Sequence, residues 1–166
     1  MKPRPNGVIL RTTEGLDLVI TRQIVAPIED VWASITEPER SARWFGAWRG
    51  TARPGATIEL QMAFEEGQPW FEARIDACEP PKHLAITQLS GGQEWSLEVT
   101  LTHNQGVTEL RFVQHQLPAD QAGAVGPGWE YYLDMLVASR EGDELPNFDD
   151  YYPSHQDYYE RQLPRA

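Results

Sequence analysis

The chain has 166 residues, 40% of them hydrophobic, with 14 Lys and Arg against 25 Asp and Glu and a formal net charge of −11 at pH 7. A composition this apolar supports one packed domain rather than disorder, and a charge this negative excludes the basic surface needed to bind nucleic acids or anionic membranes. One cysteine, Cys78, cannot form an internal disulfide, and no apolar run approaches the roughly 20 residues of a membrane span, so we expect a cytoplasmic protein.

The N-terminal part predicts one strand and two short helices. Residues 16–25 alternate apolar and polar side chains, as a half-buried strand does. Apolar side chains spaced i, i+3, i+4 and i+7 over residues 28–35 predict a helix with one apolar stripe. Thr36 and Glu39 have the spacing of a capping box, which predicts a second helix running to about Phe45.

Between Trp48 and Leu117 the period becomes two, which predicts an antiparallel meander of about six strands with one face in water. Turn signals divide this region at Glu66-Gly67, Pro80-Pro81, Gly91-Gly92 and 104–106. The inner rows of these strands are apolar except at Gln88 and Gln114. A buried amide must find a hydrogen bond, so these two either satisfy each other or the backbone, or act as polar handles for a ligand.

The helical period returns after Pro118, with an apolar stripe that starts at Trp129 and continues through Val137. Gly123, Gly126 and Gly128 precede or begin this helix, and helix entry is the role we expect for them. The rest of the chain, residues 141–166, is acidic and holds four of the six tyrosines. This tail is either a mobile extension or packs back on the sheet or on a second subunit, as in a homodimer. Four aromatic side chains in so short a stretch favour docking.

These elements predict an α+β fold in which a curved antiparallel sheet closes around a long C-terminal helix. The stretches DLVITRQIVAPIEDVWASITEPERSARWFG (17–46), CEPPKHLAIT (78–87) and GWEYYLDML (128–136) resemble the activator of heat-shock-protein-90 ATPase homologue-like family of the SRPBCC superfamily. START-like and birch-pollen-allergen-like proteins are relatives. The resemblance covers about residues 8–140, and it implies a helix-grip domain over residues 1–140 with a central cavity.

Two departures limit what the resemblance implies about roles. Many members of the family have His where Gln114 stands and an aromatic residue at Gln88, so no role is carried over to either position. The co-chaperone itself carries this domain after another domain that has no counterpart in this chain. We therefore do not expect direct stimulation of a chaperone ATPase.

The expected function is binding of an apolar or aromatic small molecule between the sheet and the last helix. The candidate ligand contacts are Trp44, Phe45, Met62, Phe64, Gln88, Trp95, Phe112, Gln114, Trp129, Tyr132, Leu133 and Leu136. No metal-binding or cofactor motif is present, so neither is expected. The alternatives are a cavity enzyme of the cyclase or hydrolase type and a co-chaperone-like interaction protein. Strand parity places no Asp, Glu or His in the hollow, so no catalytic residue is assigned and binding ranks above catalysis.

Overall fold

A computed structural model describes residues 2–89 and 95–164. Within them, eight antiparallel strands form one sheet in the order β1-β2-β8-β7-β6-β5-β4-β3. The strands are β1 (Val8–Thr12), β2 (Gly15–Ile24), β3 (Trp48–Arg49), β4 (Thr57–Gln61), β5 (Trp70–Glu79), β6 (His83–Gln88), β7 (Ser96–Asn104) and β8 (Val107–His115). The helices are α1 (Ile28–Thr36), α2 (Pro38–Ser41), α3 (Ala122–Glu141) and α4 (Gln156–Glu160), with single 3-10 turns at Ala119–Gln121 and Phe148–Asp150.

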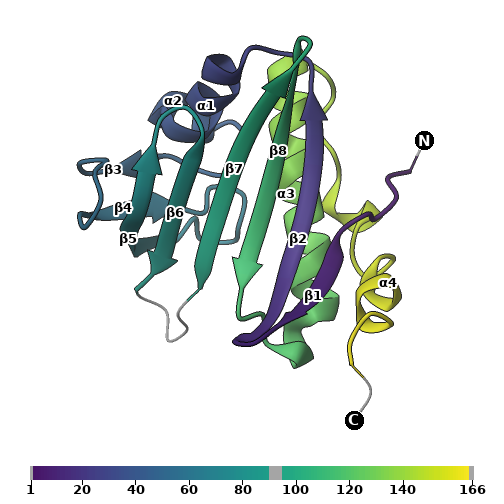
Figure 1. Cartoon of the computed structure of the whole chain (residues 1–166). Helices are drawn as coiled ribbons and strands as arrows, with labels where there is room; N and C mark the ends of the chain where they lie inside the picture. Colours follow the sequence, from purple (N-terminus) through teal and green to yellow (C-terminus); the bar gives the residue numbers. More distant parts are fainter. Residues whose placement is uncertain (1, 90–94, 165–166) are drawn as a thin grey trace.

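The long helix α3 covers one face of the curved sheet, and α1 and α2 lie at one end of it (Figure 1). The core forms where the apolar row of β2 and β8 meets the helix: Leu18, Ile20, Leu110, Leu133 and Leu136 are all at most 2% exposed. Burial of one face by a helix, with the other face in water, explains the period of two along the strands. The predicted helix-grip architecture is confirmed.

The first strand of the sheet, β1, did not emerge from the sequence pattern. It pairs with β2 from Val8 opposite Val19 to Thr12 opposite Gly15. Four of its five side chains are exposed, because it is an edge strand with little contact to the core. Without a buried row, its sequence carries no apolar alternation to detect.

The second predicted helix is shorter than expected, and its predicted cap is wrong. It ends at Ser41 rather than near Phe45. Thr36 is still the last residue of α1, and its hydroxyl donates to the carbonyl of Trp32 at 2.8 Å instead of capping α2. The chain then turns through Gly46, where a Cβ atom would lie 1.6 Å from the backbone carbonyl oxygen of the last residue of β4. Only glycine permits that approach.

The meander contains the expected six strands, β3 to β8, in consecutive antiparallel pairs. β4 is shorter than the alternation indicated and ends at Gln61. In β5 the register shifts between Ile75 and Ala77. Such a bulge moves the following side chains to the other face of the strand. The turn predicted at Gly91-Gly92 lies outside the described residues.

The helix α3 begins at Ala122, so the glycines lie inside it rather than at its entry. A Cβ atom at Gly126 would lie 2.6 Å from ring carbons of Tyr159, and one at Gly123 would lie 2.6 Å from a carboxylate oxygen of Glu160. Two of the three glycines therefore make room for α4. The tail packs on α3 and the N-terminal segment, with Tyr151 and Tyr159 2% and 0% exposed.

Candidate ligand-binding cavity

A cavity of about 340 Å³ lies between the inner face of the sheet, α1, α2 and α3. The sheet contributes apolar side chains from five neighbouring strands, β4 to β8. The helical side contributes indole and phenyl rings. The lining residues are Trp32, Ile35, Thr36, Ser41, Trp44, Phe45, Trp48, Ala52, Ile58, Leu60, Phe71, Ile75, Cys78, Pro80, Leu84, Ile86, Leu97, Val99, Leu110, Phe112, Trp129 and Leu133.

The solvent side of the cavity is marked by its two exposed lining residues. Ala52 lies in the loop between β3 and β4, and Pro80 lies in the turn between β5 and β6. The other described lining residues are buried or half-buried. These two loops border the cavity on its exposed side.

One end of the cavity is an aromatic cluster built around Phe45 and Trp129. Their rings are parallel within 2°, with centroids 6.0 Å apart. Phe112 lies 4.4 Å from the Trp129 ring, and Phe71 meets Phe45 edge-on. Close aromatic packing of this kind stabilises the wall beyond simple area burial and offers flat faces to a flat ligand.

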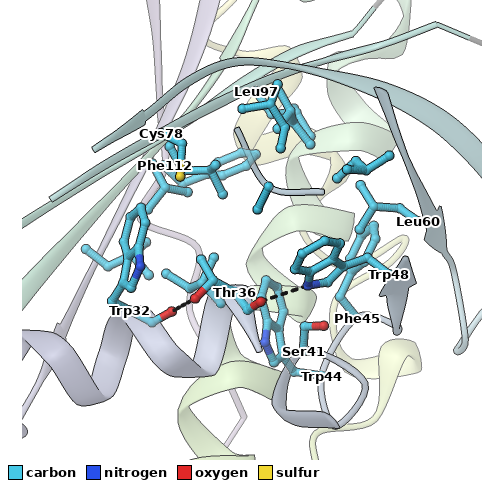
Figure 2. Close-up of a pocket in the computed structure, with 18 of the residues that line it drawn as sticks. Trp32, Thr36, Ser41, Trp44, Phe45, Trp48, Leu60, Cys78, Leu97 and Phe112 are labelled. Atoms are coloured by element: carbon cyan, nitrogen blue, oxygen red, sulfur yellow. Dashed lines mark hydrogen bonds between the residues drawn. The ribbon is translucent and has the colours of Figure 1, made fainter. Parts of the chain in front are cut away.

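The tryptophan rings are held in place through their N–H groups. Nε1 of Trp44 donates to the carbonyl of Ser34 at 2.9 Å. Nε1 of Trp48 donates to the carbonyl of Thr36 at 2.8 Å, a bond visible in Figure 2. These carbonyls belong to α1, close to its C-terminal end, where carbonyls lack partners within the helix. The helix thus fixes both rings against the cavity.

Five of the predicted ligand contacts line this cavity: Trp44, Phe45, Phe112, Trp129 and Leu133. Two others, Tyr132 and Leu136, are buried in the adjacent core. The Tyr132 hydroxyl donates to Glu65 at 2.6 Å. Burial and this bond raise the pKa of Tyr132, so it remains a neutral phenol. It acts in packing rather than in the cavity wall.

The remaining predicted contacts lie outside the lining. Met62 and Phe64 follow the end of β4, and Phe64 is 40% exposed. Gln88 and Trp95 do not line the cavity either. The backbone N–H of Gln88 donates to the carbonyl of Trp95 at 2.8 Å. Gln114 is fully buried, and its Oε1 accepts the Nε1–H of Trp129 at 2.8 Å. This bond is neither to Gln88 nor to the backbone, and the other predicted role, a polar handle for a ligand, stays a prediction.

Sequence reasoning missed five lining residues whose side chains carry a hydroxyl, a thiol or an indole N–H: Trp32, Thr36, Ser41, Trp48 and Cys78. Trp32 belongs to the apolar stripe of α1, so its inward direction was readable, but not the open space in front of it. Cys78 has the opposite parity to Ile75 in a regular strand. The bulge in β5 brings both to the cavity side.

A charged network lies on the opposite, outer face of the sheet. Glu98 accepts from Nε2 of His83 at 2.5 Å and from Nε2 of His115 at 2.9 Å. The pKa of His83 is raised, most by its hydrogen bond to Glu79 and next by its hydrogen bond to Glu98. Burial opposes the shift at His115, but bonds to Glu98 and Asp17 outweigh it and raise that pKa too. Burial is likewise outweighed at Glu98, whose pKa is lowered.

A second polar network lies under the tail. Glu130 of α3 is 1% exposed and forms a 2.8 Å ion pair with Arg22 of β2. The same carboxylate accepts from Tyr159 at 2.5 Å and from the backbone of Asn6 and Gly7. One buried side chain therefore joins the N-terminal segment, the sheet, α3 and α4. Across residues 2–89 and 95–164, no group of three or more His, Cys, Asp or Glu could hold a metal ion.

Comparison with known proteins now places the chain. The model of the family described as "Activator of Hsp90 ATPase homolog 1-like protein" matches residues 25–140. The chain belongs to this family. The family predicted from the sequence is thereby confirmed, while no curated protein matches the chain.

Solved structures similar to the chain support the fold. CalU16 from Micromonospora echinospora is 23% identical, with 96% of each chain covered and a TM-score of 0.76. The protein encoded by gene BPP1335 from Bordetella parapertussis is 23% identical, with 99% of this chain and 96% of that chain covered and a TM-score of 0.75. DynU16, from the dynemicin biosynthetic locus, is 23% identical over 82% of this chain and 50% of its own, with a TM-score of 0.68.

Among the described residues, no helix combines the length and the apolar character that a membrane span requires.

Proposed function

We propose that this family member binds an apolar or aromatic small molecule in the cavity between sheet and helices. The observation that carries the proposal is the aromatic, apolar lining of a space of about 340 Å³ between the sheet and the helices. That volume falls within the roughly 300–1,000 Å³ of small-molecule sites. DynU16, similar in fold, comes from a biosynthetic locus, which is consistent with a small-molecule role.

Burial supplies the affinity. Each 100 Å² of apolar ligand surface taken out of water contributes about 2.5 kcal/mol. The walls are pre-ordered, because the rings of Trp44 and Trp48 are already held by backbone carbonyls. A ligand therefore pays little entropy to order its site. We assign this binding to the helix-grip domain, residues 1–140, and a bracing role to the segment 141–166.

Binding is favoured over catalysis by the chemistry of the lining. None of the described residues that line the cavity is Asp, Glu, His, Lys or Arg. General acid–base catalysis needs such a group within hydrogen-bond reach of the reacting atoms. The Cys78 thiol is the one lining side chain that ionises, and no basic side chain lines the described wall beside it to activate it.

The proposal is tested with N-phenyl-1-naphthylamine, an uncharged dye whose fluorescence rises in apolar surroundings. We expect saturable binding at one site per chain. Cys78 supplies an independent readout, because it is the chain's single cysteine and lies in the cavity wall. Bound dye should slow alkylation of Cys78 by N-ethylmaleimide in proportion to occupancy.

A matched pair of variants locates the bound dye. Val99→Trp places a large ring in the cavity and should weaken dye binding at least tenfold. Val8→Trp makes the same change on the exposed face of β1, where the native side chain is 45% exposed, and should leave binding unchanged. Equal binding by both variants, or no protection of Cys78, would reject the cavity as the binding site.

A further inference from the structure

The cavity wall carries no fixed charge. Its described lining consists of apolar and aromatic side chains, two hydroxyl groups and one thiol. A carboxylate or ammonium group entering it would lose its hydration without gaining an ion pair, which is strongly unfavourable. The ligand that fits this wall is therefore uncharged.

Most polar hydrogens of the wall are already used. The hydroxyl of Thr36 donates to Trp32 O, and that of Ser41 donates to Gly46 O at 2.7 Å. Nε1 of Trp44 and of Trp48 each bind a backbone carbonyl. Nε1 of Trp129 is donated to Gln114. These groups hold the protein together and offer no hydrogen to a ligand.

Trp32 is the exception among the cavity tryptophans. In the part of the chain that the structure describes, its Nε1–H has no hydrogen-bond acceptor. Figure 2 shows its indole ring on the cavity wall opposite Trp44 and Trp48. Indole N–H is a donor only. A ligand that covers it without supplying an acceptor would strip it of water.

We propose that the cavity selects an uncharged, planar ring system that carries a carbonyl or ether oxygen, and that this oxygen accepts a hydrogen bond from Nε1 of Trp32. The inference rests on the proposed function and adds the ligand's chemical class and the residue that forms a hydrogen bond with it. The flat shape follows from the seven aromatic side chains of the lining, since aromatic rings stack well on flat ligands. The oxygen acceptor follows from the Nε1–H of Trp32 on α1, for which the described residues supply no acceptor.

The test compares fluorenone with fluorene, which share one ring frame and differ by the carbonyl oxygen. Dissociation constants are measured by displacement of N-phenyl-1-naphthylamine from the wild type and from Trp32→Phe. The fluorene-to-fluorenone ratio of dissociation constants should be roughly three- to tenfold larger in the wild type than in the variant. Taking this ratio of ratios cancels the different solubilities of the two probes.

Two control variants make the comparison specific. Trp48→Phe removes an N–H that is already bound to Thr36 O, so both probes should weaken equally and the ratio should stay at the wild-type value. Cys78→Ala removes the thiol and should also leave the ratio unchanged. The inference is overturned if the fluorene-to-fluorenone ratio falls in Trp48→Phe or Cys78→Ala and stays at the wild-type value in Trp32→Phe.

A measurement on the wild type avoids any dependence on folded variants. The carbonyl infrared band of bound fluorenone should shift to lower wavenumber than in a dry apolar solvent. Fluorene-9-carboxylate at neutral pH should bind at least a hundredfold more weakly than fluorenone. Binding of both fluorenone and fluorene with no band shift and an unchanged ratio in Trp32→Phe refutes this inference alone. Failure of the dye and both probes to bind refutes the proposed function.

Discussion

The contact between α3 and the tail makes a sharp prediction about a single methyl group. Gly126→Ala should destabilise the protein although alanine is the better helix former. The added Cβ would lie 2.6 Å from carbon atoms of the Tyr159 ring. That ring is 0% exposed, and its hydroxyl is bound to Glu130, so it has no free direction in which to move.

The magnitude follows from two opposing terms. Replacing glycine by alanine within a helix gains about 0.5–1 kcal/mol. Overpacking costs about 1–3 kcal/mol, and a rigid, anchored ring places this contact at the upper end. The net loss should be about 2 kcal/mol, which lowers the melting temperature of a domain this size by about 4–8 °C.

Gly128→Ala is the matched control two residues along the same helix. A Cβ atom there meets nothing within 4 Å, so only the helix gain remains and stability should rise by about 0.5–1 kcal/mol. Urea unfolding followed by tryptophan fluorescence measures both variants. If Gly126→Ala is as stable as Gly128→Ala, the close packing of α4 on α3 is refuted.

Three further predictions concern other parts of the fold. Gly46→Ala should cost more than about 3 kcal/mol and weaken dye binding, because the clash is with backbone that cannot yield; wild-type melting and binding would contradict this. Glu98→Gln should lower the melting temperature most between about pH 4.5 and 6.5. The two histidines have raised pKa values, so they stabilise the folded state below their ordinary pKa of 6.5 and lose this contribution as pH rises. Glu98 has a lowered pKa, so it stabilises the folded state above its ordinary pKa of 4.5 and loses this contribution as pH falls. A pH-independent difference in scanning calorimetry would refute this coupling. Glu130→Ala should cost about 3 kcal/mol in urea unfolding, because it strips Arg22 of a buried partner; a loss under 1 kcal/mol would contradict it.

The family, the meander and the long helix could all be predicted from the sequence. Alternation with a period of two set the six-stranded meander, since one face of each strand is dry and the other wet. The stripe that begins at Trp129 identified the helix that covers it. These are local periods, so they can be read without knowing what lies opposite. The exposed edge strand β1 lacks such a period and escaped notice.

Which inward-facing side chains border empty space could be learned only from the folded chain. Phe112 and Leu136 both face inward, yet one lines the cavity and the other is packed solid. That difference depends on the distance between the sheet and helices far away in sequence. The bulge in β5 changed the face of Cys78, and α4 gave Gly126 its role. Periodicity records the direction of a side chain, whereas cavities and close contacts depend on the shape of the partner surface it meets.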